Sequence, residues 1–166
     1  MEMRGSRLIA APRERVWAAL IDPETLKASV PGCEEMTGDP ERGYDARVSQ
    51  RIGPVSASFE GRIRLENVVE GRSYTILSEG KGGGAGRAQG GADIALSDEP
   101  EGTRLDYSVH ARVEGRLAKL GSRLIDAFAA RMAERFFANF QRSVETPGAP
   151  APAATGWFGR VLGRGE

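Results

Sequence analysis

Residues 103–144 read TRLDYSVHARVEGRLAKLGSRLIDAFAARMAERFFANFQRSV, and this stretch changes its hydrophobic period partway along. From Leu105 to Val113 apolar and polar residues alternate, which is typical of a β-strand with one face in water. From Leu117 to Val144 the apolar residues follow steps of three and four, which predicts one long amphipathic helix. The helix must bury its apolar stripe, so we expect it to lie across the sheet to which the strand belongs.

The N-terminal part predicts a strand over residues 3–10 and two short helices. Pro12 suits the start of the first helix, because proline fits the first helical position. Asp22 and Pro23 form an N-cap and N1 pair for the second helix, which we expect to run to about Ala28.

The middle of the chain reads as consecutive strands. Alternating patterns cover residues 44–52 and 55–65 and are separated by a Gly53-Pro54 turn, and further strand patterns surround residues 74–76, 88–96 and 105–113. Short connections between such strands predict an antiparallel sheet. The sequence therefore predicts an α+β fold, in which a curved antiparallel sheet wraps around a long C-terminal helix.

Composition narrows the classes of function. The chain has 166 residues, 23 basic and 23 acidic side chains, one cysteine and one histidine. The balanced charge argues against a nucleic-acid partner, and so few cysteines and histidines argue against a zinc site. The N-terminus shows no long apolar segment, and no stretch approaches the length that spans a bilayer. We expect a soluble, cytoplasmic protein without a disulfide.

The predicted inner face of the sheet carries large and small residues in an uneven mixture. The small ones, such as Ala57, Gly61 and Gly90, could accommodate the phenylalanine rings of the helix or could leave a hollow. The pattern alone leaves both interpretations open. If a hollow exists, the residues we expect to line it are Phe59, Ile63, Tyr74, Ile76, Ala88, Ala92, Leu105, Tyr107, Leu124, Phe128 and Met132.

Several segments together resemble the family of the G subunit of carbon monoxide dehydrogenase, over about residues 1–145. The matching residues are Ala11-Pro12, Val16-Trp17, Leu20, Asp22-Pro23, Leu26 and Val30-Pro31-Gly32-Cys33, then Gly80-Lys81-Gly82 with Gly84-Ala85-Gly86-Arg87-Ala88-Gln89-Gly90, then Thr103-Arg104-Leu105, Tyr107, Gly115-Arg116-Leu117-Ala118, Leu120-Gly121 and Phe136-Phe137. The family belongs to the START-like, or SRPBCC, superfamily, and the resemblance therefore implies the helix-grip fold.

The resemblance also implies a function. Members of this family are non-catalytic accessory proteins of molybdenum hydroxylases of the carbon monoxide dehydrogenase type, and they bring the enzyme and the membrane quinone pool together. It implies a lipophilic cavity that holds a quinone as a ligand, no cofactor, and peripheral association with the inner face of the cytoplasmic membrane. Two alternatives stay open: a START-like enzyme acting on a hydrophobic substrate, and a maturation factor for the molybdenum enzyme.

Other conspicuous residues favour structural roles. His110 falls on the polar side of its strand, so we do not expect it to be catalytic. Cys33 is expected to be a buried structural thiol, and the tyrosines are expected to be core residues, with Tyr107 as the one to test as a hydrogen-bond donor. The run GKGGGAGRAQGG at residues 80–91 does not match a phosphate-binding loop and predicts a hairpin connection, with a flexible flap as the alternative.

The last 21 residues, TPGAPAPAATGWFGRVLGRGE, form a tether and an apolar patch. Residues 146–156 are rich in proline and alanine, which predicts an extended linker after a domain of residues 1–145. The short amphipathic tail of residues 157–166 combines apolar and basic residues, which are Trp157, Phe158, Arg160, Val161, Leu162 and Arg164. This composition favours reversible docking on a membrane surface or in a groove of a partner protein over packing against its own domain.

Overall fold

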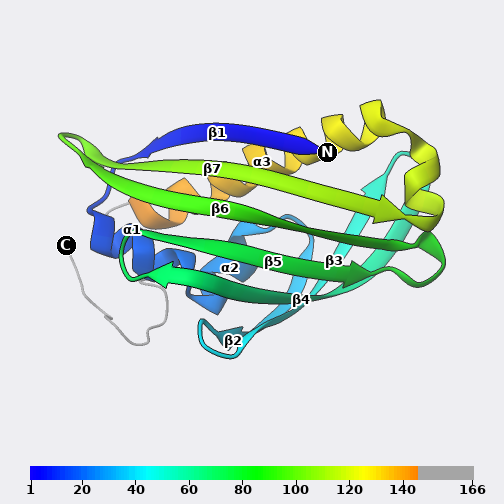
Figure 1. The fold of residues 1–166 in the computed structure, drawn as a ribbon, viewed down its shortest axis with the longest axis horizontal. Helices are drawn as coiled ribbons and strands as arrows, with labels where there is room; N and C mark the ends of the chain where they lie inside the picture. Colours follow the sequence, from blue (N-terminus) through cyan, green and yellow to red (C-terminus); the bar gives the residue numbers. More distant parts are fainter. Residues whose placement is uncertain (146–166) are drawn as a thin grey trace.

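The computed structural model describes residues 1–145, which form one seven-stranded antiparallel sheet and three α-helices (Figure 1). The strands lie in the order β1-β7-β6-β5-β4-β3-β2. Their bounds are β1 Glu2–Ile9, β2 Cys33–Asp39, β3 Gly43–Ile52, β4 Val55–Val69, β5 Ser73–Lys81, β6 Arg87–Glu99 and β7 Gly102–Glu114.

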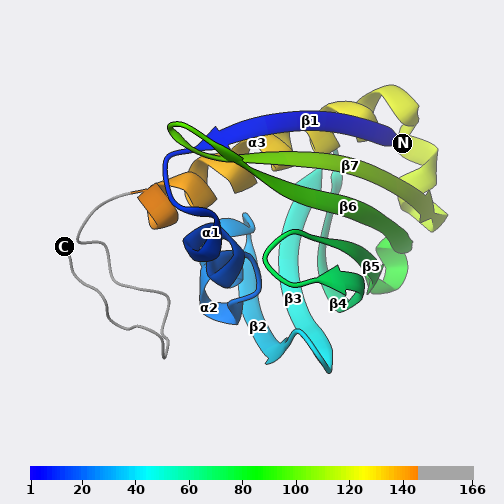
Figure 2. The same cartoon turned by 60° about the vertical axis from the view of Figure 1, so that its left-hand side comes forward.

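The helices are α1 Arg13–Leu20, α2 Pro23–Ser29 and the long α3 Ser122–Glu145. Two short 3-10 segments lie at one end of the sheet: η1 Gly83–Ala85 connects β5 to β6, and η2 Gly115–Leu120 connects β7 to α3. In two views of the molecule α3 runs behind β1 and β7, while α1 and α2 sit near its C-terminal half (Figures 1 and 2). This arrangement is the predicted α+β helix-grip fold, with a curved sheet around one long helix.

The sequence signals for the short helices are confirmed. The Asp22 carboxylate accepts a hydrogen bond from the backbone N–H of Thr25 at 2.8 Å, and Pro23 occupies the first turn of α2. An N-cap of this kind satisfies one of the backbone donors that a helix start leaves unpaired. At α1, Pro12 is the N-cap residue rather than the first helical residue.

Two parts of the fold differ from the sequence expectation. The helix expected from Leu117 begins at Ser122, because Leu117 and Leu120 belong to the 3-10 segment η2, and Gly121 with φ of 90° separates the two. A spacing of three residues fits a 3-10 turn as well as an α-helix. The edge strand β2 was not expected, because Met36 is the one buried residue in its CEEMTGD sequence.

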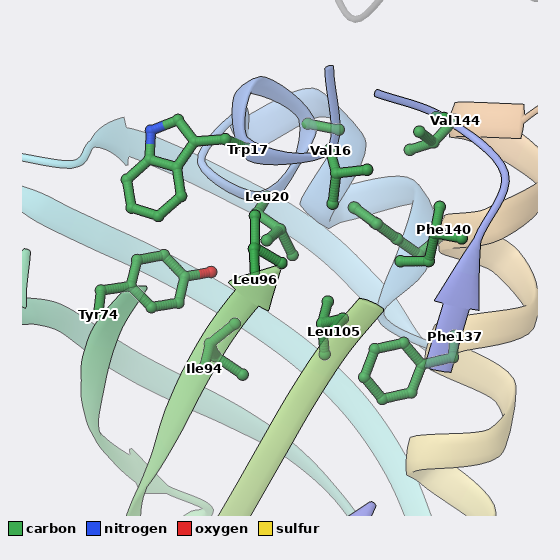
Figure 3. Close-up of a cluster of buried hydrophobic side chains, with 13 residues drawn as sticks. Val16, Trp17, Leu20, Tyr74, Ile94, Leu96, Leu105, Phe137, Phe140 and Val144 are labelled. Carbon is green, nitrogen blue, oxygen red and sulfur yellow. The ribbon is translucent and has the colours of Figure 1, made fainter. Parts of the chain in front are cut away.

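The main hydrophobic core lies between the sheet, α1 and the C-terminal half of α3 (Figure 3). Phe140 is fully buried, and the rings of Trp17 and Tyr74 face each other with centroids 5.3 Å apart. The core residues that surround them are Ile9, Ala11, Val16, Ala19, Leu20, Ile94, Leu96, Leu105, Phe137 and Val144. Large side chains therefore fill this half of the molecule.

A second, smaller cluster lies at the other end of the sheet. Val55, Ala85 and Leu117 are its buried members, and they come from the β3–β4, β5–β6 and β7–α3 connections. Ile52, Ala57, Phe59, Val113 and Leu120 pack against them. The two clusters thus stabilise opposite ends of the sheet, and the space between them contains the candidate site.

Within residues 1–145, no helix is both long enough and apolar enough to cross a bilayer.

Candidate functional site

A cavity of about 490 Å³ lies between the sheet and the N-terminal half of α3. Seven α3 residues form one wall, and they are Ile125, Phe128, Ala129, Met132, Ala133, Phe136 and Phe137. The remaining lining residues are Met1, Met3, Val30, Pro31, Val48, Gln50, Ile52, Phe59, Ala88, Ile94, Tyr107, Val109, Ala111, Val113 and Leu117. The volume falls within the range of small-molecule binding sites.

The cavity exists because small residues face one another there. Ala88 on β6, Ala111 on β7 and Ala129 and Ala133 on α3 all contribute to its lining. Interiors normally close-pack, so facing alanines leave a hollow unless a neighbouring side chain reaches in. Not every small residue of the inner face contributes to the hollow, since Ala57 packs against the smaller cluster and Ala92 packs against the main core.

Of the described residues that line the cavity, all are apolar except Gln50 and Tyr107. Gln50 donates a hydrogen bond from Nε2 to the carbonyl oxygen of Pro31 at 2.5 Å, which holds its side chain in place. The hydroxyl group of Tyr107 has no hydrogen-bond partner within residues 1–145. The surface that the lining presents to the cavity is nonetheless almost wholly apolar.

The ring of Tyr107 is held on both sides. It stacks on Phe137 of α3, with centroids 4.9 Å apart and an angle of 29° between the planes. On β1 it lies over Gly5, its register partner in the neighbouring strand, where an added Cβ would collide with the tyrosine hydroxyl. The absence of a side chain at Gly5 therefore makes room for the Tyr107 ring against the edge strand.

Beside this aromatic pair, the side chain of Arg7 on β1 contacts two side chains of α3. It forms an ion pair with Glu134 at 2.6 Å, and its guanidinium group lies 5.2 Å from the centroid of the Phe137 ring. Two further α3 side chains reach the same strand, since Gln141 donates to the Leu8 carbonyl and Glu145 accepts from the Ala10 N–H. The C-terminal half of α3 is therefore fastened to β1.

Five of the eleven residues expected around a ligand line this cavity, and they are Phe59, Ala88, Tyr107, Phe128 and Met132. The other six do not. Tyr74 and Leu105 belong to the main core, Ile76 and Ala92 pack against it, and Ile63 and Leu124 are half-buried outside the lining. The reason is that α1 and the C-terminal half of α3 fill the space in front of β5 and of the first residues of β7.

Part of the lining was not predicted from the sequence. On β3, Val48, Gln50 and Ile52 all face the cavity, and their alternation along the strand was a usable signal. Met1, just before β1, and Met3 on β1 contribute as well, in the same alternation that continues through Gly5. Val30 and Pro31 follow the end of α2, and no periodic pattern could have identified them.

Neither His110 nor Cys33 lines the cavity. His110 is exposed on the outer face of β7 and its ring lies over Gly91. Cys33 is half-buried rather than buried, because it opens the edge strand β2, and burial raises the pKa of its thiol. A raised pKa keeps the thiol protonated and unreactive near neutral pH. Within residues 1–145, no group of three potential metal ligands comes together.

The other tyrosines and the glycine-rich segment have structural positions. Tyr44 donates a hydrogen bond to the carbonyl oxygen of Ile21 at 2.7 Å, and burial raises the pKa of both Tyr44 and Tyr74. Residues 80–91 form a hairpin, as predicted: they run from the end of β5 through a connection at residues 82–86 into β6, and the Gly82 N–H donates to the Gly86 carbonyl. The linker of residues 146–156 and the tail of residues 157–166 lie outside the described residues.

Solved structures share this fold. A conserved protein from Geobacillus kaustophilus is 27% identical, with a TM-score of 0.81 over 87% of this chain and 95% of that one. Protein CV1439 from Chromobacterium violaceum is 18% identical with a TM-score of 0.64, over 88% and 99% of the two chains. TTHA0849 from Thermus thermophilus is 19% identical with a TM-score of 0.64, over 87% and 97%.

No curated protein matches the chain. The family model for CoxG, the G subunit of carbon monoxide dehydrogenase, matches residues 5–145, which includes every strand from within β1 onward and all three helices. The apolar cavity beneath α3 lies wholly within the matched region apart from Met1 and Met3. The chain belongs to the CoxG family, that of the carbon monoxide dehydrogenase G subunit.

Proposed function

We propose that this protein is a non-catalytic accessory protein that binds a lipophilic small molecule of the quinone class in the cavity beneath α3. The observation that carries the proposal is the cavity itself, whose lining is apolar except for the side chains of Gln50 and Tyr107. In the proposed role the protein serves a molybdenum hydroxylase of the carbon monoxide dehydrogenase type. It recruits the enzyme to the membrane or carries quinone between the two.

The lining suits the two parts of a quinone. A quinone head group is a flat ring with carbonyl acceptors, and it carries an apolar tail. The Tyr107 hydroxyl, which lies over Gly5 beside the cavity, is a donor with no partner within residues 1–145, and the aromatic side chains of Phe59 and Phe128 line the cavity. Hydrogen bonds from a preformed, otherwise apolar site are how such pockets orient their ligands.

The same lining supports a carrier rather than an enzyme. Catalysis of proton transfer needs an acid or base with a suitable pKa in reach of the ligand. Among residues 1–145, the lining includes no histidine, carboxylate, lysine or arginine side chain, and His110 lies on the opposite face of the sheet.

The proposed partner rests on the family name, and the proposed docking on a membrane or partner rests on the composition of the tail. The family is named after a component of carbon monoxide dehydrogenase, which suggests an enzyme of that type as the partner. We propose the tail residues Trp157, Phe158, Arg160, Val161, Leu162 and Arg164 as a segment that docks on the membrane or on the partner.

The binding proposal is tested with decylubiquinone and a matched pair of helix variants. Ala129 lines the cavity and Ala130, its neighbour on α3, is exposed. Ala129→Phe should fill the hollow and weaken decylubiquinone binding at least about tenfold, whereas Ala130→Phe should leave the affinity unchanged. Equilibrium dialysis of the full chain with the quinone measures both.

A second variant tests the polar contact. Tyr107→Phe keeps the ring and removes the donor, so the affinity should fall about three- to tenfold, the usual worth of one hydrogen bond. The proposal fails if the unaltered chain does not bind decylubiquinone, or if Ala129→Phe and Ala130→Phe bind it equally well.

A further inference from the structure

The net charge of the chain is zero, but basic and acidic residues gather in connections at opposite ends of the sheet. The β3–β4, β5–β6 and β7–α3 connections lie together at the right-hand end of Figure 1. Residues 51–55, 81–87 and 114–123, which form that end, include a single acidic residue, Glu114, and six basic ones. We call this surface the basic end, and its basic residues are Arg51, Lys81, Arg87, Arg116, Lys119 and Arg123.

The opposite ends of the strands carry the opposite charge. Residues 39–43, 69–73 and 98–102 form the β2–β3, β4–β5 and β6–β7 connections, and in these ranges acidic residues outnumber basic ones by six to two. The acidic residues are Asp39, Glu41, Glu70, Asp98, Glu99 and Glu101. In an antiparallel sheet successive connections lie at opposite ends. The basic residues and the acidic residues are therefore separated in space.

The charges of the basic end are available to a partner. All six basic side chains are exposed, and Arg87 alone among them forms an ion pair within residues 1–145, with Glu114 at 3.3 Å. The helix α3 also begins here, at Ser122, and the N-terminus of a long helix adds partial positive charge. The field of this end therefore attracts anions.

The basic end also borders the cavity. Ile52, Phe59, Val113 and Leu117 line the cavity and at the same time belong to, or pack against, the smaller hydrophobic cluster. That cluster is built from the same three connections that carry the basic residues. The smaller cluster therefore lies between the cavity and the basic end, and its members Val55, Ala85 and Leu117 are buried.

We propose that the basic end is the surface by which the folded domain itself docks on an anionic phospholipid bilayer. The inference deepens the proposed function, because it names the surface that faces the source of a lipophilic ligand. The six exposed cations match the phosphates of anionic phospholipids, and each basic residue near an anionic surface contributes about 1 kcal/mol to binding. An acidic protein would match the same charges but would supply no lipophilic ligand to the cavity beside them.

Two double variants with equal changes in charge provide the test. Lys119→Glu/Arg123→Glu reverses two charges of the basic end, and neither residue lines the cavity. Arg15→Glu/Arg72→Glu reverses two exposed charges elsewhere, on α1 and in the β4–β5 connection. Both variants keep the tail, so a contribution of the tail to binding is the same in each.

The measurement is co-sedimentation of the full chain with vesicles of phosphatidylglycerol and phosphatidylcholine in equal parts. The basic-end variant should bind at least about thirtyfold more weakly than the unaltered chain, and the control variant should bind within about threefold of it. Binding should also fall steeply as salt rises from about 0.05 to 0.5 M, because salt screens exposed charges.

The outcomes separate this inference from the proposed function. It is overturned if both variants sediment alike, if pure phosphatidylcholine vesicles bind as well as the anionic ones, or if the basic-end variant loses binding to a partner hydroxylase but not to vesicles. Decylubiquinone binding without vesicles is measured on the same variants. If the unaltered chain does not bind decylubiquinone, the proposed function is overturned. The vesicle result tests the docking surface independently of that outcome.

Discussion

The two halves of α3 have similar apolar stripes but different surroundings. In the C-terminal half, Phe137, Phe140 and Val144 are buried in the main core. In the N-terminal half, Ile125, Phe128 and Met132 are half-buried and face the cavity. One amphipathic helix thus contributes to a close-packed core over one half of its length and to a binding site over the other.

The two halves of α3 differ because different elements lie opposite them. Under the C-terminal half, α1 supplies Val16, Trp17 and Leu20, which fill the gap to the sheet (Figure 3). Under the N-terminal half, alanines on β6 and β7 face alanines on α3. Packing against a helix therefore cannot be inferred from its own amphipathicity, because the opposing layer decides whether a core or a hollow results.

The largest expected effect comes from removing one phenylalanine in each half. Phe140→Ala should lower the free energy of unfolding by about 3–5 kcal/mol, because it opens a void in the core. Phe128→Ala should cost only about 1 kcal/mol, since its ring already borders a hollow. Urea denaturation of both variants measures the difference, and equal losses would mean that the two halves are packed alike.

A smaller effect is expected when a methyl side chain is enlarged in each half. Ala19→Leu should destabilise the protein by about 1–3 kcal/mol, because Ala19 is 1% exposed in a full core. Ala133→Leu should leave the stability within about 0.5 kcal/mol or raise it, because the added atoms enter the cavity. Thermal unfolding would contradict the comparison if Ala133→Leu destabilised as much as Ala19→Leu.

The smallest expected effect is on the pH dependence of the free energy of unfolding at alkaline pH, which reports whether water reaches the main core. Burial raises the pKa of Tyr74 and of Tyr44 above the usual value of about 10. A raised folded-state pKa means that the unfolded chain loses its proton first. The associated stability is therefore complete below about pH 10 and is lost as pH rises through the folded pKa, by about 1.4 kcal/mol per pH unit for each tyrosine.

Tyr74→Phe should remove the share of this slope that belongs to Tyr74 and should change the stability little at pH 7. Urea denaturation of the variant and the unaltered chain between about pH 9 and 11 gives the two slopes. Identical slopes would show that water reaches the Tyr74 hydroxyl in the folded protein.

Much of the fold could be predicted because each element carried a local signal. The alternation from Leu105 to Val113 and the capping residues Asp22 and Pro23 act over a few residues, and the structure follows them. The strand β2 carried a weak signal because it lies at the edge of the sheet with one buried side chain. The exact start of α3 was obscured because Leu117 and Leu120 suit both kinds of helix.

The site could be predicted only in part, since a cavity depends on contacts between distant segments. Tyr74 and Tyr107 both lie on the inner face of the sheet, yet Tyr74 meets Trp17 of α1 whereas Tyr107 lines the cavity. Nothing in the alternation of their strands distinguishes them. The position of α1 over the sheet decides it, and that position is a property of the whole fold.

The direction of α3 has a consequence for how the molecule would stand on a surface. The helix begins at the basic end and its 24 residues place Glu145 about 36 Å away. A protein resting on its basic end would hold Glu145 at up to that distance from the lipid. The domain would then act as a spacer between the lipid at the start of α3 and anything bound near the end of α3.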